Sequence, residues 1–471
     1  MEPRLPRSLS SGGGRAVAAA VAIFAAASLL AAVTSDGFLN ADAATHFAYA
    51  RHAIRDPYAL VNVWARPLAT GLFMFPAAIG GRLGVRMVSL ACALVCALTA
   101  WRLAIWQNYR WPALAAIFTL GQPLLFMHSF SELTELPFAA TAGLAFLAYR
   151  RRSWWLLAIL GSLLPLGRPE GFGFCLLAAL GLVLHRRARW LFLLPLPVLA
   201  WSLAGWIICH RQGAWWLWLI HNWPYSAGSD YARGSLLHFV FDLPALVSPV
   251  AFIPVWIGVA RGFGRPIAGG HEGRCQWLIA FIPTVVLVVH SLLFWLGRFS
   301  SDGELRYLLI AAPFWGLLAA DGWECALARS TRTTATIWAA LGLLAPASIL
   351  PFFPIIPVHM NADWQSARRL VAWYQASPLY REYPNLIYAH PAIEYFTDDG
   401  VSATLSTPEA VAAAPAGSLL IWDGEFSAHN ADPSRDVTAE QVPAAEWKPI
   451  AVPADVGGPW RLFLSRPQPG E

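Results

Sequence analysis

Residues 111–149, WPALAAIFTLGQPLLFMHSFSELTELPFAATAGLAFLAY, contain the pattern that decides the fold. Two apolar runs, 111–127 and 133–149, are joined by only a few polar residues. A helix that crosses a bilayer needs about 20 mainly apolar residues, with a range of about 17 to 25. Each run has the length of such a helix, so the stretch predicts two membrane-spanning helices with a short acidic connection.

The same composition extends over most of the chain. Of its 471 residues, 57% are hydrophobic and 13% are charged, and the mean hydropathy is +0.49. A soluble globular protein carries about 25% charged residues, so a single water-soluble core is excluded. The 24 Trp and 26 Phe residues exclude low-complexity disorder. The chain is therefore predicted to be a membrane protein.

Nine further runs have a similar length, which gives about eleven spans. They are 15–34, 85–105, 153–167, 171–185, 189–209, 241–260, 276–296, 305–320 and 334–353. Residues 67–81 are shorter and contain Pro76 and three glycines, which favours a re-entrant or interfacial helix. The predicted fold class is an all-α polytopic transmembrane bundle over residues 15–357, preceded by a cytoplasmic leader, 1–14.

Arginine clusters predict the orientation of this bundle, because cytoplasmic loops collect Lys and Arg. With the N terminus inside, six successive inside segments hold Arg4, Arg7 and Arg15; Arg102 and Arg110; Arg150 to Arg152; Arg186, Arg187 and Arg189; Arg261, Arg265 and Arg274; and Arg329 and Arg332. An odd number of spans then places the C-terminal region outside. We expect a multi-pass protein of the inner (plasma) membrane, and the ratio of 32 Arg to one Lys suggests a bacterial source.

The last part of the chain has a different composition. Residues 358–471 contain 14 Asp and Glu but 7 Lys and Arg, a net charge of −7, whereas the first 357 residues carry +12. A helical stretch, 364–374, is followed by short apolar strands at 385–388 and 418–422. This pattern predicts a small extracytoplasmic α/β domain. The bases of the first part lie between apolar runs, which argues against nucleic-acid binding.

Candidate site residues gather at the predicted outer ends of the spans, where carboxylates are costly and therefore informative. The outer loop, 35–66, contains Asp42 and His46, which are four residues apart on a predicted amphipathic helix lying on the membrane surface. Asp42 is interpreted either as a helix cap or as a general base with His46 as an orienting neighbour or substrate contact.

Two further carboxylates lie in the connection that opened this section. Glu132 and Glu135 are three residues apart and can share a helix face. They are either a solvated helix end or part of a substrate site. An idle hairpin would use Gly, Asn or Ser, so the substrate site remains a candidate.

The remaining candidates lie in two other outer connections. Arg168 and Glu170 either neutralise each other, or Arg168 offers its guanidinium group to a phosphate. Glu304, Arg306 and Tyr307 run directly into a span, where Arg306 is either a snorkelling anchor or a ligand for a lipid phosphate.

Together these motifs resemble the GT-C glycosyltransferases, which include protein O-mannosyltransferases, the aminoarabinose transferase of lipid A and the GPI and dolichol-pathway mannosyltransferases. The resemblance rests on an acid followed by His in the first outer loop, the Ser-Glu-Leu-Thr-Glu, Arg-Pro-Glu-Gly and Gly-Glu-Leu-Arg-Tyr motifs, and Pro313. The sequence departs from the family where many members have two adjacent acids and this chain has Ala41-Asp42. It also has Asp302-Gly-Glu304-Leu-Arg306-Tyr307 where mannosyltransferases carry His-Lys-Glu-x-Arg-Phe.

The resemblance implies a polyprenyl-phosphate-linked sugar donor, an extracytoplasmic active site and Asp42 as the catalytic base. The acceptor is a lipid, a glycan or a protein, and a single displacement would invert the anomeric centre. No cofactor is required, although the carboxylates make a divalent metal possible. The alternatives are a transporter or flippase for a lipid-linked or anionic substrate, and a membrane polymerase, ligase or assembly subunit of another fold.

Overall fold

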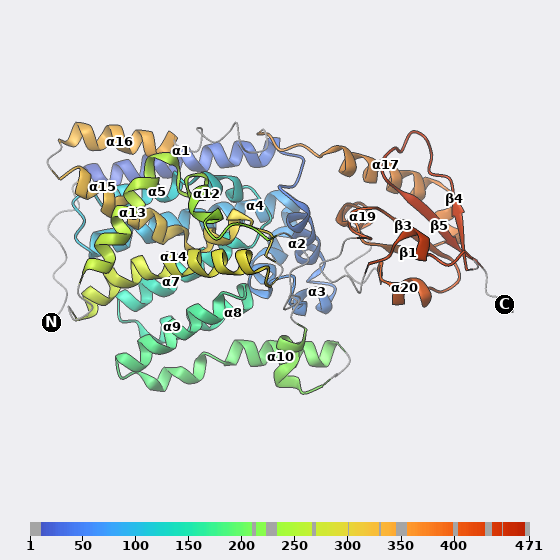
Figure 1. The fold of residues 1–471 in the computed structure, drawn as a ribbon, viewed down its shortest axis with the longest axis horizontal. Helices are drawn as coiled ribbons and strands as arrows, with labels where there is room; N and C mark the ends of the chain where they lie inside the picture. Colours follow the sequence, from blue (N-terminus) through green and yellow to red (C-terminus); the bar gives the residue numbers. More distant parts are fainter. Residues whose placement is uncertain are drawn as a thin grey trace.

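The computed structural model describes residues 11–209, 213–222, 233–265, 270–299, 301–328, 331–344, 356–398, 404–428, 436–444 and 446–466. Residues 1–10 of the expected leader and residues 345–353 of the last expected span lie outside this part of the chain. The described residues form a helical bundle with a small sheet domain at one end (Figure 1).

The bundle is built from helices that follow the apolar runs. Their bounds are α1 Ser11–Thr34, α2 Ala41–His52, α3 Pro57–Val61, α4 Pro67–Trp106, α5 Ala113–Leu120, α6 Pro123–Ser129, α7 Glu135–Arg150, α8 Trp154–Gly167, α9 Gly171–Leu184, η1 Ala188–Leu193, α10 Leu196–Ile208, η2 Trp215–Leu217, α11 Trp218–His221, α12 His238–Val247, α13 Pro249–Gly264, α14 Gly270–Leu296, η3 Leu305–Ala311, α15 Ala312–Ala326 and α16 Arg332–Leu344.

The expected number of about eleven spans is not confirmed. In the described part of the chain, four helices are long and apolar enough to cross a membrane, or five if α12 and α13 count as one span. The other runs are interrupted: 111–127 divides at Gly121 between α5 and α6, and α12 meets α13 at an angle of 116°. Helices α8 and α9 are apolar but have only 14 residues each.

The segment 67–81 is the first part of the 40-residue helix α4. Gly81 has φ 56° and ψ −142°, so the helix is broken at the glycine that ends the segment. A residue with a Cβ would be strained at this φ, whereas glycine adopts it readily. The sequence predicted a helix over 67–81 that is separate from the span at 85–105. The break at Gly81 separates these two parts, but no loop lies between them.

The C-terminal region is the expected α/β unit. Its elements are α17 Ala362–Ala376, α18 Leu379–Glu382, β1 Asn385–Tyr388, α19 Pro391–Thr397, β2 Thr404–Leu405, α20 Pro408–Ala412, β3 Ser418–Trp422, η6 Ala439–Gln441, β4 Trp447–Ile450 and β5 Arg461–Ser465. The strand order is β2-β1-β3-β5-β4. Strand β1 is parallel to β2 and β3, whereas β5 is antiparallel to β3 and β4.

Alternation along the strands separates two hydrophobic cores. Leu419 and Ile421 of β3 pack with the residues of α17 and α19, whereas Leu420 packs on the opposite face with Val411 of α20. Side chains on successive strand positions point to opposite faces of a sheet. The short strands predicted at 385–388 and 418–422 are therefore buried on both sides.

Helix α2 differs from the expected surface helix. Ala44 packs in the core of the C-terminal domain, and Phe47 and Ala50 pack against α4 residues such as Phe73. Helix α2 therefore lies between the bundle and the sheet domain rather than on a free amphipathic surface (Figure 1). The spacing of its apolar residues predicted the helix. It did not predict that the C-terminal domain covers the face of α2 that carries Ala44.

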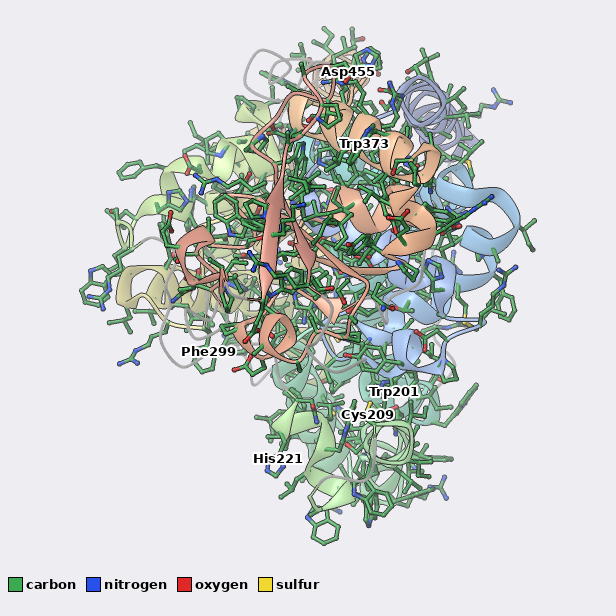
Figure 2. The ribbon with its side chains drawn as sticks, turned by 90° about the vertical axis from the view of Figure 1, so that its right-hand side faces the viewer. Trp201, Cys209, His221, Phe299, Trp373 and Asp455 are labelled. Carbon is green, nitrogen blue, oxygen red and sulfur yellow. The ribbon has the colours of Figure 1, made fainter. Side chains whose placement is uncertain are left out.

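A backbone contact joins the domain to the first outer loop. Gly37 N donates to Val358 O at 2.8 Å, and a Cβ at Gly37 would lie 2.6 Å from the carbonyl carbon of His359. The His359 ring lies 2.9 Å from the Asp36 carboxylate. Viewed from the domain, the sheet covers the end of the bundle, while α10, with Trp201 and Cys209, projects beyond it (Figure 2).

Candidate active site

Asp42 lies in the first turn of α2, but it does not cap the helix. The cap is Asn40, whose side chain accepts a hydrogen bond from Ala43 N at 3.1 Å. The carboxylate of Asp42 instead accepts a hydrogen bond from Arg306 Nη2 at 2.5 Å. The interpretation of Asp42 as a helix cap is therefore wrong.

The loop before η3 holds Arg306 in place. Asp302 Oδ1 accepts hydrogen bonds from Glu304 N at 3.1 Å and from the Tyr307 hydroxyl at 2.6 Å, which turns the chain so that Glu304 and Arg306 face the same space. Glu304 also forms an ion pair with Arg306 Nε. Arg306 thus binds two carboxylates, Asp42 of α2 and Glu304 of its own loop.

A third carboxylate connects this pair to the other predicted arginine. Glu135, the first residue of α7, lies 3.8 Å from Arg306 Nε and accepts a hydrogen bond from Arg168 Nη1 at 2.8 Å. Its second oxygen is 3.5 Å from His128 Nδ1. The side chain of Glu135 keeps only 2% of its surface exposed, whereas Asp42 keeps 39%. Asp42 is therefore within reach of a substrate, whereas Glu135 is not.

Arg168 and Glu170 continue the cluster toward α14. Arg168 Nε is 3.5 Å from Glu170 Oε2, and His290 Nε2 of α14 is 3.2 Å from Glu170 Oε1. The ring of Tyr307 stacks on His290 with centroids 5.2 Å apart, and the Arg168 guanidinium carbon is 5.7 Å from the Tyr307 ring. Arg168 therefore pairs with Glu170, as one of its two interpretations expects, and it also binds Glu135.

We call this set the ionic cluster: Asp42, Glu135, Glu170, Glu304, Arg66, Arg168 and Arg306, with His128 and His290 at its edge. Arg66 precedes α4 and is buried, and burial together with the nearby Arg168 lowers its pKa to about 10. The formal charge of the seven ionisable members is −1 when all are ionised. The sequence analysis placed six of these residues at the outer ends of the spans, but it did not predict the contacts of Asp42 with Arg306 or of Glu135 with Arg168.

His46 does not contact Asp42 through a hydrogen bond among the described residues. Its ring stacks on Trp64 with centroids 4.7 Å apart, and Nδ1 is buried without a hydrogen-bond partner in the described structure. Burial lowers the pKa of His46 to about 3, so the ring is neutral at physiological pH. His46 therefore offers a neutral acceptor or donor near Asp42, not a cationic one.

Glu132 belongs to a separate cluster. It precedes α7 and is fully buried, with Arg86 Nε donating to its carboxylate at 2.8 Å and Arg82 Nε at 3.4 Å. Arg86 also donates to the backbone carbonyls of Ala32, Ser35 and Gly37. Glu132 and Glu135 therefore bind different arginines, and Glu132 fixes the start of the outer loop.

Sequence reasoning missed Arg82, Arg86, His128 and His290 as partners of the carboxylates. The sequence did contain an indication of these four partners, because each is an ionisable residue in or beside an apolar run, where an unpaired charge is costly. The sequence could not show which carboxylate each would meet.

The electrostatics separate the two exposed carboxylates. Burial raises the pKa of Asp42, but the charge of Arg306 and its hydrogen bond lower it by more, so the pKa of Asp42 lies below the ordinary range. Burial raises the pKa of Glu304 to about 7, and Arg306 offsets only part of this effect. At neutral pH Asp42 is ionised, whereas Glu304 is about half protonated.

A polar cavity of about 290 Å³ lies beside the N-terminal end of α2, between the outer loop and the C-terminal domain. Ala41 lines it, next to Asp42, and the facing side chains include Asp363, Trp364, His390 and Glu425. Among the described residues, no group of three or more His, Cys, Asp or Glu side chains is arranged to hold a metal ion.

No protein-family model matches the chain, and no curated protein matches its sequence. Among solved structures, ArnT from Cupriavidus metallidurans bound to undecaprenyl phosphate is 13% identical, over 82% of this chain and 70% of ArnT, with a TM-score of 0.51. The apo state of that protein is 17% identical over 78% of this chain and 70% of ArnT, with a TM-score of 0.49. The chain therefore shares the fold of ArnT over most of its length.

Proposed function

We propose that this protein is a membrane-embedded glycosyltransferase that moves a sugar from a polyprenyl-phosphate-linked donor to an acceptor hydroxyl on the extracytoplasmic face. The observation that supports this most is the hydrogen bond between Asp42 and Arg306, which joins a half-exposed carboxylate, the proposed base, to the proposed phosphate-binding cation. The shared fold with ArnT, which was solved with undecaprenyl phosphate, supports a lipid-phosphate donor.

In this proposal the donor activates the base. Without donor, Arg306 binds Asp42 and Glu304. The phosphate of the donor is an anion that a guanidinium group binds with paired hydrogen bonds, so it competes with these carboxylates for Arg306. As Arg306 turns toward the phosphate, Asp42 loses its counter-charge and its pKa rises, which makes it a stronger base only when donor is present.

Arg168 is the second candidate ligand for the phosphate. It is bound by Glu135 at 2.8 Å and lies 3.5 Å from Glu170, so its position is more fixed than that of Arg306. It also lies close to the Tyr307 ring. We assign Arg306 the direct phosphate contact and Arg168 a supporting positive charge, with Glu135, Glu170 and Tyr307 holding both.

The reaction then needs one displacement. The acceptor oxygen attacks the anomeric carbon, the acceptor proton moves to Asp42, and the bond from the anomeric carbon to the phosphate oxygen breaks with its electron pair on the phosphate. The lipid phosphate is a good leaving group, so no strong general acid is required, and Arg306 and Arg168 stabilise its negative charge. A single displacement by one hydroxyl inverts the anomeric configuration.

The polar cavity beside Ala41 is the proposed entry for the acceptor. Its aromatic and polar wall suits a sugar ring, since aromatic faces pack on apolar ring faces while carboxylates accept hydroxyl hydrogen bonds. Asp363 and Glu425 give it negative charge, which disfavours an acceptor that carries phosphate at this position. Because the cavity adjoins the N-terminal end of α2, an acceptor bound there lies near Asp42.

The arginines at the opposite end of the bundle support the proposed orientation. Arg150, Arg151 and Arg152 end α7 at the pole opposite Glu135, and Arg186, Arg187 and Arg189 follow α9 at the same pole. Under the rule that cytoplasmic loops are rich in arginine, this pole is cytoplasmic. The ionic cluster and the C-terminal domain would then be extracytoplasmic.

The experiment is sugar transfer by purified protein from a synthetic polyprenyl-phosphate sugar to a panel of glycan, lipid and peptide acceptors. Release of polyprenyl phosphate with loss of the sugar from the donor supports the proposal, and an Asp42→Asn variant should lack both. A protein that moves the intact lipid-linked sugar across proteoliposome membranes without breaking the glycosidic bond would be a flippase instead.

A further inference from the structure

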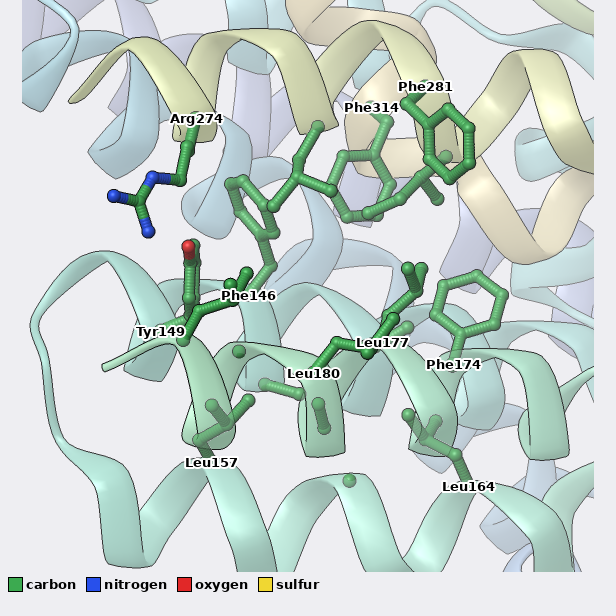
Figure 3. A pocket seen from close by; sticks show the side chains of 18 of the residues that line it. Phe146, Tyr149, Leu157, Leu164, Phe174, Leu177, Leu180, Arg274, Phe281 and Phe314 are labelled. Carbon is green, nitrogen blue, oxygen red and sulfur yellow. The ribbon is translucent and has the colours of Figure 1, made fainter. Parts of the chain in front are cut away.

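An apolar cavity of about 330 Å³ lies inside the bundle, away from the ionic cluster. Its walls come from α7, α8, α9 and α14 (Figure 3). Aliphatic and aromatic side chains such as Phe146, Leu157, Leu164, Phe174 and Phe281 line it. The chemistry of this wall suits a hydrocarbon chain, because it offers almost no hydrogen-bonding group.

One end of the cavity carries a cation. Arg274 of α14 is the one charged residue that lines it, and Figure 3 shows its guanidinium group beside the hydroxyl of Tyr149 at that end. Arg274 makes no hydrogen bond or ion pair within the described part of the chain. A half-buried guanidinium group without an anionic partner, placed at the end of an apolar cavity, indicates a ligand with a negative head and a hydrocarbon tail.

Two more arginines approach the same end from other segments. Arg152 N donates to Tyr149 O at 3.0 Å and Arg187 N donates to Leu182 O at 2.8 Å, so both arginines follow the helix ends that form this end of the cavity. Both act electrostatically on His185, as Arg274 does. The nearby carboxylate of Glu272 is bound to Arg150, and none of the three arginines forms an ion pair with a carboxylate among the described residues. Arg152 has a left-handed backbone with φ 58°, where glycine would be less strained.

The cavity also opens toward lipid. Leu180 and Leu184 line it and are exposed on the surface of α9. A large apolar side chain exposed on an apolar helix of a membrane protein faces the acyl chains of the bilayer. A lipid can therefore enter sideways from the bilayer, without passing through the protein.

We propose that this cavity binds one acyl chain of an anionic glycerophospholipid, with the lipid phosphate held by Arg274, Arg152 and Arg187. Basic pockets between membrane helices recognise anionic headgroups in this way. The bound lipid would hold α9 and α14 together at a point where they are separated by empty space.

The position argues against the sugar donor as the occupant. Glu135 of the ionic cluster and Tyr149 of the cavity end lie at opposite ends of α7, 14 residues apart, which corresponds to about 21 Å along the helix. A donor phosphate at Arg274 would be too far from Asp42 to react. The proposal does not depend on the proposed function, because a transporter with this fold would keep the same lipid site.

Native mass spectrometry of the full-length protein tests the proposal, with phosphatidylglycerol and phosphatidylcholine added in equal amounts as probes. We expect one tightly retained phosphatidylglycerol, a drop in its retention of about tenfold in Arg274→Gln, and a loss in Leu180→Trp, which fills the cavity from its exposed side. Arg102→Gln is the matched control, since Arg102 stacks on Trp106 and does not line the cavity. It should retain the lipid.

Three results would overturn the proposal. These are equal retention of phosphatidylcholine and phosphatidylglycerol, unchanged retention in both Arg274→Gln and Leu180→Trp, and displacement of the retained lipid by one equivalent of polyprenyl phosphate. The last result would assign the cavity to the tail of the donor. The melting temperature of each variant without added lipid distinguishes loss of the site from loss of the fold.

Discussion

The carboxylate of Asp42 accepts a hydrogen bond at 2.5 Å from Arg306, which lies 264 residues further along the chain. The contact joins the first outer loop to the segment that leads into α15, and both residues border the accessible part of the ionic cluster. Asn40 caps the helix that carries Asp42, so the carboxylate is not needed for capping.

Replacement of Arg306 tests the phosphate contact. Arg306→Ala should lower kcat/KM for the lipid donor by about 100-fold or more, in the range measured for loss of one donor to a developing oxyanion. Arg306→Lys should restore only part of this activity, because an ammonium group cannot form the paired hydrogen bonds of guanidinium. Steady-state kinetics with varied donor provide the measurement, and full activity in Arg306→Ala would transfer the phosphate contact to Arg168.

Glu304 predicts a pH dependence of donor binding. Its pKa of about 7 means that it is mostly neutral at about pH 6 and mostly ionised at about pH 8. Ionised Glu304 competes with the donor phosphate for Arg306, whereas the phosphodiester of the donor keeps its charge over this range. The KM for donor should therefore rise by up to about tenfold between these pH values, as the protonated fraction falls by that factor.

Glu304→Gln removes the titrating group and serves as the matched variant. It should give a low KM for donor that stays constant over the same pH range. A rise in KM that persists in Glu304→Gln would show that another group causes the pH dependence.

Glu132 was expected to contact substrate, but its surroundings predict a different phenotype. Glu132→Gln leaves the buried guanidinium group of Arg86 and the half-buried one of Arg82 without their carboxylate. Removal of one partner of a buried ion pair costs about 3–5 kcal/mol. The variant should lose thermal stability, measured in detergent, while the KM of the folded fraction for donor stays unchanged. A stable variant with a raised KM would restore Glu132 to the substrate site.

The sequence predicted which residues face one side but not how they pair. The periodic apolar residues of 43–54 and the helix-starting position of Asp42 predicted α2, and short apolar runs predicted β1 and β3 at their observed bounds. Pairing such as Glu135 with Arg168, or Glu132 with Arg86, depends on how helices pack. Apolar patterns do not specify packing, since most lipid-facing and most core-facing residues are alike apolar.

The number of spans could also not be predicted from the apolar runs of the sequence. Hydropathy measures how apolar a run is, but it does not register a break such as the one at Ser248, where φ is 83° and two helices meet at a steep angle. The apolar runs of α8 and α9 are likewise real helices that are shorter than the usual span. Tertiary packing, not apolarity, decides where each run ends.

Docking of the C-terminal domain depends on Gly37. Gly37→Ala places a methyl group 2.6 Å from the backbone of His359, so the contact between the outer loop and the domain must open. We expect faster limited proteolysis between α16 and α17 and reduced transfer, with little change in the helical circular dichroism signal. Gly14→Ala, where a Cβ meets no atom within 4 Å, is the control and should behave as the wild type.

The orientation can be measured by labelling single cysteines in intact cells, in a variant whose six native cysteines are replaced. A cysteine at the exposed position Glu440 should react with a membrane-impermeant maleimide, because the C-terminal domain is proposed to be outside. A cysteine at the exposed position Arg186, on the arginine-rich pole, should react only after the membrane is permeabilised. The reverse pattern would place the ionic cluster on the cytoplasmic side.

The most direct test of the account is sugar transfer by Asp42→Asn, measured on the same preparation as its melting temperature. Asparagine keeps the shape and an oxygen that accepts from Arg306, but it cannot take the acceptor proton. We predict an unchanged melting temperature within a few degrees and a fall in kcat of about two to four orders of magnitude. The Thr407→Ala control, which removes the side chain that caps α20, should instead destabilise the protein by about 1 kcal/mol and keep most of its kcat. Near-wild-type transfer by Asp42→Asn would contradict the role of Asp42 as the base.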